Sequence, residues 1–251
     1  MYKKITIVLF LSVLLLLFGC TKSLKIEEIN VAVCPDFPPF EYTINDTLDG
    51  LDIQLIKSIS SKFKVPITFT ELPFNQLLES LEKGETDIAI SGITVTNSRK
   101  KIFDFSVPYY SAKQVILTNE SHNITIDSLD TISNYKIAVF RNSGSQLFLE
   151  NTLVQNHKLS ANKIIKTDNL EEMLYLLSSD SIQLLMLENS YAELIKNKYK
   201  LKILFESDIE DNFAIAFPKN SQIFNPINQF LLKFLESNEW YIIKERYLLN
   251  E

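Results

Sequence analysis

Histidine and cysteine are scarce in this sequence, and this scarcity restricts the chemistry open to the chain. Among 251 residues there are two histidines and two cysteines. His122 and His157 lie in polar, loop-like segments, ESHNIT and VQNHKLS, and we interpret both as surface residues. The sequence has no nucleophile elbow, no GxGxxG loop and no metal-spaced cluster. A hydrolase with two catalytic carboxylates stays open because acidic residues are plentiful, although no pattern brings two of them together in a cleft.

Basic residues are also in the minority, which argues against a nucleic-acid partner. The formal net charge is −6, and removing residues 1–19 takes away Lys3 and Lys4, which leaves 23 basic against 31 acidic side chains and a net charge of −8. A chain with this balance is repelled by a phosphate backbone. With 46% apolar and 11% aromatic residues, it can bury one large core or two smaller ones.

The first 20 residues have the layout of a secretion signal. Two lysines in MYKK precede a 14-residue apolar run, ITIVLFLSVLLLLF, which is too short to span a membrane. The segment from Leu17 to Cys20 resembles the bacterial lipobox, in which the cysteine becomes diacylated and forms the new N-terminus, although Phe18 is bulkier than usual. We therefore predict a signal peptide over residues 1–19 and lipidation of Cys20, against the alternative of an ordinary buried or free cysteine. Lipidation leaves Cys34 as the only thiol, which excludes an intrachain disulfide and a cysteine-based metal site.

The rest of the chain alternates between apolar strands and amphipathic helices, and the order repeats after about 110 residues. Strands are predicted at residues 26–34, 67–72, 87–92, 135–140, 163–167, 182–188 and 202–206, and helices at 52–63, 74–84, 170–179 and 191–198 and from Gln146. Such alternation predicts parallel sheets with helices on their faces. Because the set occurs twice, we expect two α/β lobes with a ligand in the cleft between them.

Six motifs are distributed over this pattern. They are PPFEY (38–42), GLDIQL (50–55), LEKGETD (81–87), SGITVTNSR (91–99), FSVPYY (105–110) and NFAIAFPKNS (212–221). Together they resemble the extracytoplasmic solute-binding proteins of ABC importers, in the polar amino-acid binding group known as family 3, from about Val31 to Tyr247.

This resemblance implies a fold and a set of partners. The fold would be the type II periplasmic-binding fold, with two Rossmann-like α/β lobes joined by two crossing hinge strands near Ser111 and Asp211. Residues 26–110 and 212–251 would form the first lobe, and residues 111–211 the second. The protein would be a monomer without cofactor or metal, anchored by its N-terminal lipid in the periplasm or at the cell surface. It would deliver an amino acid to an ABC permease in the inner membrane.

The residues around the fourth motif suit the carboxylate of such a ligand. Burying a charged group costs several kcal/mol unless it is paired, so a cleft that takes an amino acid must supply opposite charges. Arg99 offers a planar fork of donors matched to a carboxylate. Ser91 and Thr94 add hydroxyls, while Gly92 lets the backbone approach closely. Thr96 is expected to cap a short helix. The alternative for Arg99 is an exposed arginine that balances a nearby acid.

The ammonium partner is expected from the other lobe, because only a contact from that lobe gives the cleft a reason to close. Glu188 ends an apolar strand, at the position where the family has an aspartate that binds the ligand amino group. The alternative is that Glu188 only caps the following helix.

Aromatic residues are predicted to wall the pocket and to exclude water from the charge pairs. Phe37, Phe40 and Phe74 align with family positions that enclose the ligand side chain, although core packing is an equal alternative for Phe40. Ser145 begins a helix of the second lobe, where N–H groups favour a carboxylate, and Ser143 is the weaker alternative for this role.

Two residues depart from the pattern of relatives that bind basic amino acids. Cys34 stands where they commonly have an aspartate, and Gln183 where an acid often occurs, so the resemblance does not by itself establish a cationic ligand. Two other functions are possible on the same scaffold. One is an enzyme similar to cyclohexadienyl dehydratase, and the other is a lipoprotein that senses its ligand without transport.

Overall fold

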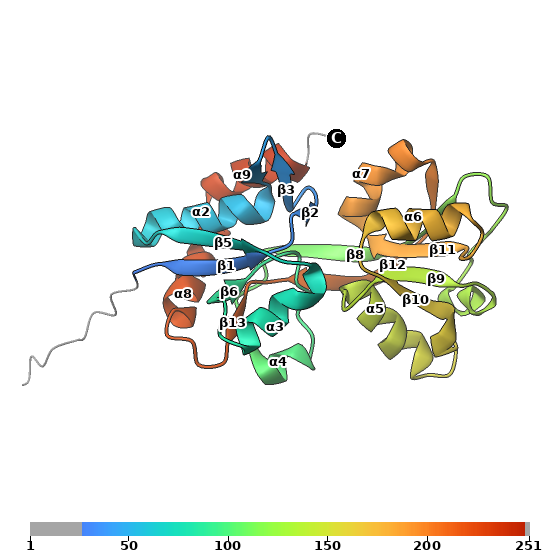
Figure 1. Ribbon diagram of the computed structural model, residues 1–251, viewed down its shortest axis with the longest axis horizontal. Coiled ribbons are helices and arrows are strands. Elements are labelled where there is room, and N and C mark those ends of the chain that lie inside the picture. The colour runs from blue at the N-terminus through green and yellow to red at the C-terminus, as the bar shows by residue number, and fades with distance from the viewer. Residues whose placement is uncertain (1–26, 249–251) are drawn as a thin grey trace, which may run out of the picture.

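The computed structural model describes residues 27–248. Two α/β lobes lie side by side along the long axis of the molecule, as Figure 1 shows. The first lobe is built from strands β1 (Ile29–Val33), β2 (Asp36–Phe37), β3 (Glu41–Ile44), β4 (Thr47–Asp49), β5 (Ile67–Glu71), β6 (Ile88–Ala89), β7 (Phe103–Phe105) and β13 (Ala216–Pro218), helices α2 (Leu51–Phe63), α3 (Leu77–Glu82), α4 (Arg99–Ile102), α8 (Phe224–Phe234) and α9 (Asn238–Leu248), and the 3-10 turn η1 (Phe74–Gln76). The second lobe is built from strands β8 (Tyr110–Asn119), β9 (Ile137–Phe140), β10 (Ile164–Thr167), β11 (Leu184–Glu188) and β12 (Leu201–Phe213), and from helices α5 (Gly144–Leu149), α6 (Leu170–Ser178) and α7 (Asn189–Tyr199). It also contains the 3-10 helices η2 (Leu129–Asn134) and η4 (Ala161–Lys163) and the π-helix η3 (Glu150–Val154).

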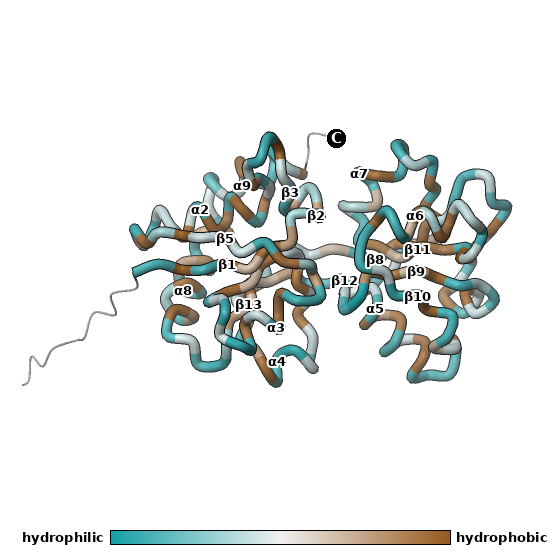
Figure 2. The backbone as a smooth tube through the Cα atoms, in the orientation of Figure 1, coloured by the Kyte–Doolittle hydropathy of each residue, from teal (hydrophilic) through white to brown (hydrophobic). Residues whose placement is uncertain are grey.

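The sheet of the first lobe has the strand order β5-β1-β6-β13-β7. Strand β1 pairs in parallel with β5 and β6, whereas β13 returns from the end of the chain and runs antiparallel between β6 and β7. Helices lie above and below this sheet (Figure 1), which explains why the central strands are apolar on both faces. The tube in Figure 2 is accordingly hydrophobic through the interior of each lobe and hydrophilic in the outer loops.

The sheet of the second lobe has the order β10-β9-β11-β8-β12. Alternate residues of β8 point to opposite faces, as a strand requires. Val115 and Leu117 join a core with α6 and α7, and Ile116 joins a second core that includes Phe148 and Leu149 of α5. The predicted two-lobed α/β fold is therefore confirmed.

Strands β8 and β12 cross from one lobe to the other. They form one long antiparallel ladder in which Tyr110 faces Phe213 at the end nearest the first lobe. The predicted boundaries near Ser111 and Asp211 fall within this ladder and stay predictions of where the hinge bends. The pairing register shifts between Glu206, which faces Val115, and Glu210, which faces Lys113. Residues 207–209 of β12 therefore lie opposite the single residue Gln114 of β8.

Most of the predicted elements differ from the observed ones only at their ends, but the structure departs from the prediction in two main features. The first is the small sheet β2-β3-β4, whose tight turn places Asn45 and Asp46 at φ 48° and 59°. The second is the length of β12, predicted at residues 202–206, which continues to Phe213 because it pairs along the whole of β8. None of the helices in the described part of the chain is long and apolar enough to span a membrane.

Candidate ligand-binding cleft

A cavity of about 720 Å³ lies between the lobes. Its walls come from the β1–β2 loop, residues 71–75 and residues 91–92 of the first lobe, and from the ends of β9, β10 and β11 and the starts of α6 and α7 of the second. These are the carboxyl ends of parallel strands, where α/β sheets place their ligands.

The structure brings together only some of the predicted ligand-binding residues. Those that line the cavity are Phe37, Phe74, Ser91, Gly92 and Glu188, together with the alternative residue Ser143. The four that do not line it are Phe40, Thr94, Arg99 and Ser145.

The turn after β6 shapes the floor of the cavity. The hydroxyl of Ser91 accepts a hydrogen bond from the N–H of Cys34 at 2.8 Å, and the N–H of Gly92 donates to Oδ2 of Asp52 at 3.1 Å. Gly92 has φ 53°, and a Cβ at this position would lie 2.6 Å from Cε1 of Phe37. The absence of a side chain therefore lets the Phe37 ring lie directly over the turn.

Arg99 is buried, with 8% of its surface exposed, so the exposed-arginine alternative does not hold. Its Nη1 donates to the carbonyl oxygen of Thr94 at 2.7 Å, and its Nη2 crosses to the second lobe and donates to that of Asn142 at 2.6 Å. The guanidinium lines a second cavity of about 190 Å³, which adjoins the main cavity at Phe74. Burial lowers the pKa of Arg99 to about 10, so it keeps its charge at neutral pH.

The two threonine hydroxyl groups near Arg99 differ in their surroundings. Thr96 Oγ1 accepts a hydrogen bond from the N–H of Arg99, the first residue of α4, at 3.2 Å, as expected of a residue that satisfies an N–H group at the helix start, although Ser98 is the residue directly before the helix. Thr94 is buried, and its Oγ1 has no hydrogen-bond partner among the described residues. The same oxygen occupies the space that a Cβ on Gly144 would need. The two lobes are therefore in close contact at this point.

Glu188 ends β11 at the cavity wall and is 5% exposed. It directly precedes α7, but its side chain makes no capping hydrogen bond to that helix, which argues against the capping alternative. Burial raises the pKa of its carboxyl to about 7, and the charge of Asp211 adds to this shift. Such a group is expected to attract a cation that enters the cavity.

Neither serine of the α5 segment is free in the cavity. Ser143 caps α5, where its Oγ accepts from the N–H of Gln146 at 3.2 Å. Ser145 is 1% exposed and donates to Oε1 of Gln114 at 2.6 Å. Gln114 was not predicted as a site residue, and the only sequence signal for it is a polar residue within the apolar run of β8.

The aromatic residues form a row that crosses the cleft. Phe40 is fully buried in the core, and its ring stacks behind that of Phe37 at 5.1 Å between centroids. The core interpretation of Phe40 thus fits its position. Phe37 in turn contacts Tyr191 of α7 at 5.2 Å, and Tyr191 lies 6.4 Å from Phe140. Tyr191 was missed because its spacing in α7 is typical of an ordinary core position.

Carboxylates predominate among the charged residues of the cavity wall. The acidic residues that line it are Asp36, Glu71, Asp168, Glu171 and Glu188. Among the described residues, Arg141 is the one basic residue that lines the cavity. Its Nε lies 2.8 Å from Oδ1 of Asp168, so the charge of Arg141 is already paired. The cavity wall therefore carries a net negative charge.

Comparison with known proteins identifies the family. The model for bacterial extracellular solute-binding proteins, family 3, matches residues 29–250, and the chain belongs to this family. The family consists of binding proteins that act outside the cytoplasm rather than enzymes.

Individual relatives cover most of the chain. The arginine-binding extracellular protein ArtP of Bacillus subtilis is 27% identical over 90% of this chain and 88% of its own. A probable histidine-binding protein of Campylobacter jejuni is 26% identical over 77% of this chain and 73% of its own. Among solved structures, an ancestral arginine-binding protein bound to arginine has a TM-score of 0.79 at 28% identity and covers 88% of this chain and 98% of its own. The arginine-, lysine-, histidine-binding protein ArtJ of Geobacillus stearothermophilus has a TM-score of 0.80 at 23% identity and covers 89% of this chain and 96% of its own. This likeness supports the two-lobed fold.

Proposed function

We propose that this protein binds a cationic amino acid between its lobes and delivers it to an ABC-type permease. The observation that carries this proposal is the acidic wall of the inter-lobe cavity, which has five acidic residues and one arginine, and the arginine is paired with one of the five, Asp168. A cation gains free energy on entering such a cavity, whereas an acidic ligand would be repelled. The names of the relatives, which include arginine- and histidine-binding proteins, support the same ligand class.

The two charges of the ligand backbone would be met from opposite lobes. Arg99 belongs to the first lobe and lines the smaller cavity that adjoins the main one at Phe74. It would take a ligand carboxylate placed at this junction, and would exchange one of its carbonyl partners for the stronger charged one. Glu188 belongs to the second lobe and would take the ammonium. Because each lobe supplies one charge, the ligand gains both contacts only when the cleft is closed.

The cationic side chain of the ligand would be held by the acidic residues of the cavity wall. It would not be held by Cys34 or Gln183, the two positions that depart from the pattern of relatives that bind basic amino acids. Cys34 lines the cavity, but burial raises the pKa of its thiol, which keeps it neutral. Gln183 uses its side chain within the second lobe, where Oε1 accepts from the N–H of Lys136 at 3.2 Å and Nε2 donates to the carbonyl of Asp180 at 3.0 Å. The acids left for the side chain are Asp36, Glu71 and Glu171.

The protein would stand outside the cytoplasmic membrane as a lipid-anchored monomer. The support for the anchor is the lipobox-like sequence that ends at Cys20, which lies outside the described residues. The closed cleft would present a surface made from both lobes, which a permease can distinguish from the open form.

Calorimetry with arginine and citrulline tests the ligand class. Citrulline keeps the shape and the backbone charges of arginine but lacks the side-chain charge. We expect arginine to bind at least about tenfold more tightly, since a charge-assisted contact contributes about 1.5 to 3 kcal/mol. Glu188→Gln should weaken the binding of arginine and of citrulline by a similar factor, because both ligands carry the α-ammonium group. Equal binding of arginine and citrulline by the wild type would contradict the cationic specificity.

A further inference from the structure

The amide of Gln114 joins three polar side chains beside the cavity. Gln114 is fully buried in β8 and lies directly opposite Glu188 in the β8–β11 ladder. Its Nε2 donates to Oδ2 of Asp211 at 2.5 Å and reaches Oε1 of Glu188 at 3.4 Å, while its Oε1 accepts from Ser145. An ionised carboxylate can only accept hydrogen bonds, so the NH₂ end of the amide faces the two acids when they are charged. One amide group thus connects a cavity residue, Glu188, to an acid outside the cavity wall.

Asp211 lies on the hinge strand β12, where the two lobes meet. It faces Ala112 in the β8–β12 ladder, two residues from the end nearest the first lobe. Its Oδ2 is 3.0 Å from the place that a Cβ on Gly144 would occupy, and its charge acts on Arg99 of the first lobe. The irregular part of β12, residues 207–209, lies opposite Gln114 and ends shortly before Asp211.

Two ionisable groups of the described chain face Glu188 from neighbouring elements. Asp211 faces it from β12, and Tyr191 faces it from α7, where burial raises the pKa of the phenol and keeps it neutral. Arg99 acts on Asp211 from the first lobe. The remaining charged residues of the cavity wall are Asp36, Glu71, Arg141, Asp168 and Glu171.

We propose that Asp211 is a positioning residue for ligand binding, which holds the Gln114 amide from the hinge strand and thereby fixes Glu188 in place and controls its charge. The proposal rests on the proposed function in one respect, namely that Glu188 receives the ligand ammonium. Because Asp211 sits on a strand that joins the lobes, it connects this contact to the region that must bend during closure.

The direction of the pH dependence follows from the charges. Glu188 binds an ammonium only when it is ionised, and burial has raised its pKa to about 7. Affinity should therefore be full above about pH 7 and should decrease as the pH falls below it. Asp211→Asn removes a negative neighbour, so it should move this midpoint to a lower pH, by roughly one pH unit. Gln114→Met removes the amide donor that stabilises the ionised form, so it should move the midpoint up.

The experiment measures arginine affinity by calorimetry from pH 5.5 to 9 in the full mature chain. At pH 6 we expect Asp211→Asn to bind arginine several-fold more tightly than the wild type, because a lower midpoint leaves a larger fraction of Glu188 ionised at that pH. Glu210→Gln is the matched control. Glu210 is the neighbouring acid on the same strand, but it is exposed and accepts from Ser111 Oγ instead. This control should keep the wild-type midpoint.

A second readout separates this proposal from the proposed function. Carbon NMR of the Glu188 carboxyl, assigned with Glu188→Gln, follows the same titration in the protein without ligand. If arginine does not bind at any pH, the proposed function fails, but this titration still tests Asp211. Asp211→Asn and Gln114→Met are first checked for a cooperative thermal unfolding transition. If one of them does not fold, the Glu188 midpoint is compared between the other variant and the wild type. An unchanged Glu188 midpoint in a folded Asp211→Asn or Gln114→Met variant overturns the proposal.

Discussion

Arg99 is a buried cation that is solvated by backbone carbonyls rather than paired directly with an acid. Its two terminal nitrogens bond to the carbonyl oxygens of Thr94 and Asn142, one in each lobe. Carbonyl groups carry only partial charges, so a full carboxylate is a better partner for the same donors. The two carbonyl groups thereby hold the side chain in place, and under the proposed function a ligand carboxylate would supply its strongest interaction.

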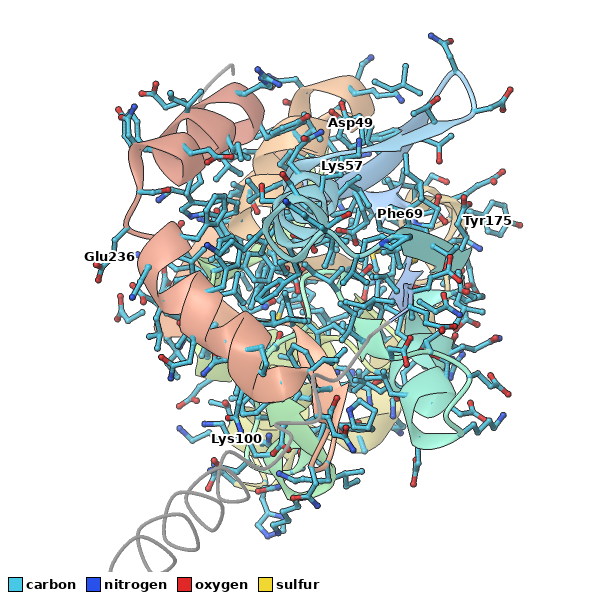
Figure 3. All side chains as sticks on the ribbon, turned by 90° about the vertical axis from the view of Figure 1, so that its left-hand side faces the viewer. Asp49, Lys57, Phe69, Lys100, Tyr175 and Glu236 are labelled. Atoms are coloured by element: carbon cyan, nitrogen blue, oxygen red, sulfur yellow. The ribbon has the colours of Figure 1, made fainter. Side chains whose placement is uncertain are left out.

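Arg99→Ala should abolish amino-acid binding. The ligand carboxylate would be buried without its partner, which costs about 3 to 5 kcal/mol and weakens binding by more than about a hundredfold. Calorimetry checks the affinity, and circular dichroism checks that the variant is folded. Lys100→Ala is the matched control, because Lys100 is the exposed neighbour on α4 that is labelled in Figure 3. Wild-type affinity in a folded Arg99→Ala variant would contradict the assignment of Arg99 to the ligand carboxylate.

At the scale of elements, the turn after β6 depends on Gly92 in two ways. Its φ of 53° is unfavourable for other residues, and its missing side chain makes room for Phe37. The Phe37 ring cannot retreat easily, because it stacks on Phe40 on one side and contacts Tyr191 on another.

Gly92→Ala should cost more stability than Gly84→Ala. Gly84 also has positive φ, 71°, but no atom lies within 4 Å of the place that a Cβ would occupy there, so its substitution carries only the backbone cost of about 1 kcal/mol. Gly92→Ala carries the same cost and also displaces Phe37. Urea denaturation compares the two variants, and calorimetry should show weaker ligand binding for Gly92→Ala alone. Equal losses of stability and unchanged binding would show that the contact with Phe37 is unimportant.

The sequence predicts the repeating elements better than their irregular parts. Apolar periodicity locates strands such as β9 and helices such as α6 to within a few residues, because burial of a sheet or helix face controls both. The irregular segment of β12 has no such signal, since it depends on the pairing of two distant strands. The same holds for Gln114 and Asp211, which are brought together only by that pairing. Motif likeness indicates Arg99 and Glu188 but does not give their partners.

At the scale of the whole molecule, the predicted lipidation of Cys20 would hold the folded lobes at a membrane surface. Cys20→Ala should convert a membrane-bound protein into one released to the extracytoplasmic space, because a lipid chain contributes about 0.8 kcal/mol per buried CH₂. Cell fractionation with immunoblotting checks this outcome. Cys34→Ala is the control, since Cys34 is buried in the first lobe and should not affect partitioning. A Cys20→Ala protein that still sediments wholly with membranes would place the anchor elsewhere.

The return of the chain to the first lobe has a consequence for the order in which the protein matures. Strand β13 is inserted between β6 and β7, and Tyr247 in α9 donates a hydrogen bond to Asp49 at 2.7 Å. A chain that crosses a membrane from its N-terminus emerges with the first lobe incomplete, while the second lobe is continuous from β8 to β12. The second lobe can thus fold while translocation is still under way. The first lobe is completed only when the last residues arrive, and until then β6 and β7 lack the strand that pairs with both of them.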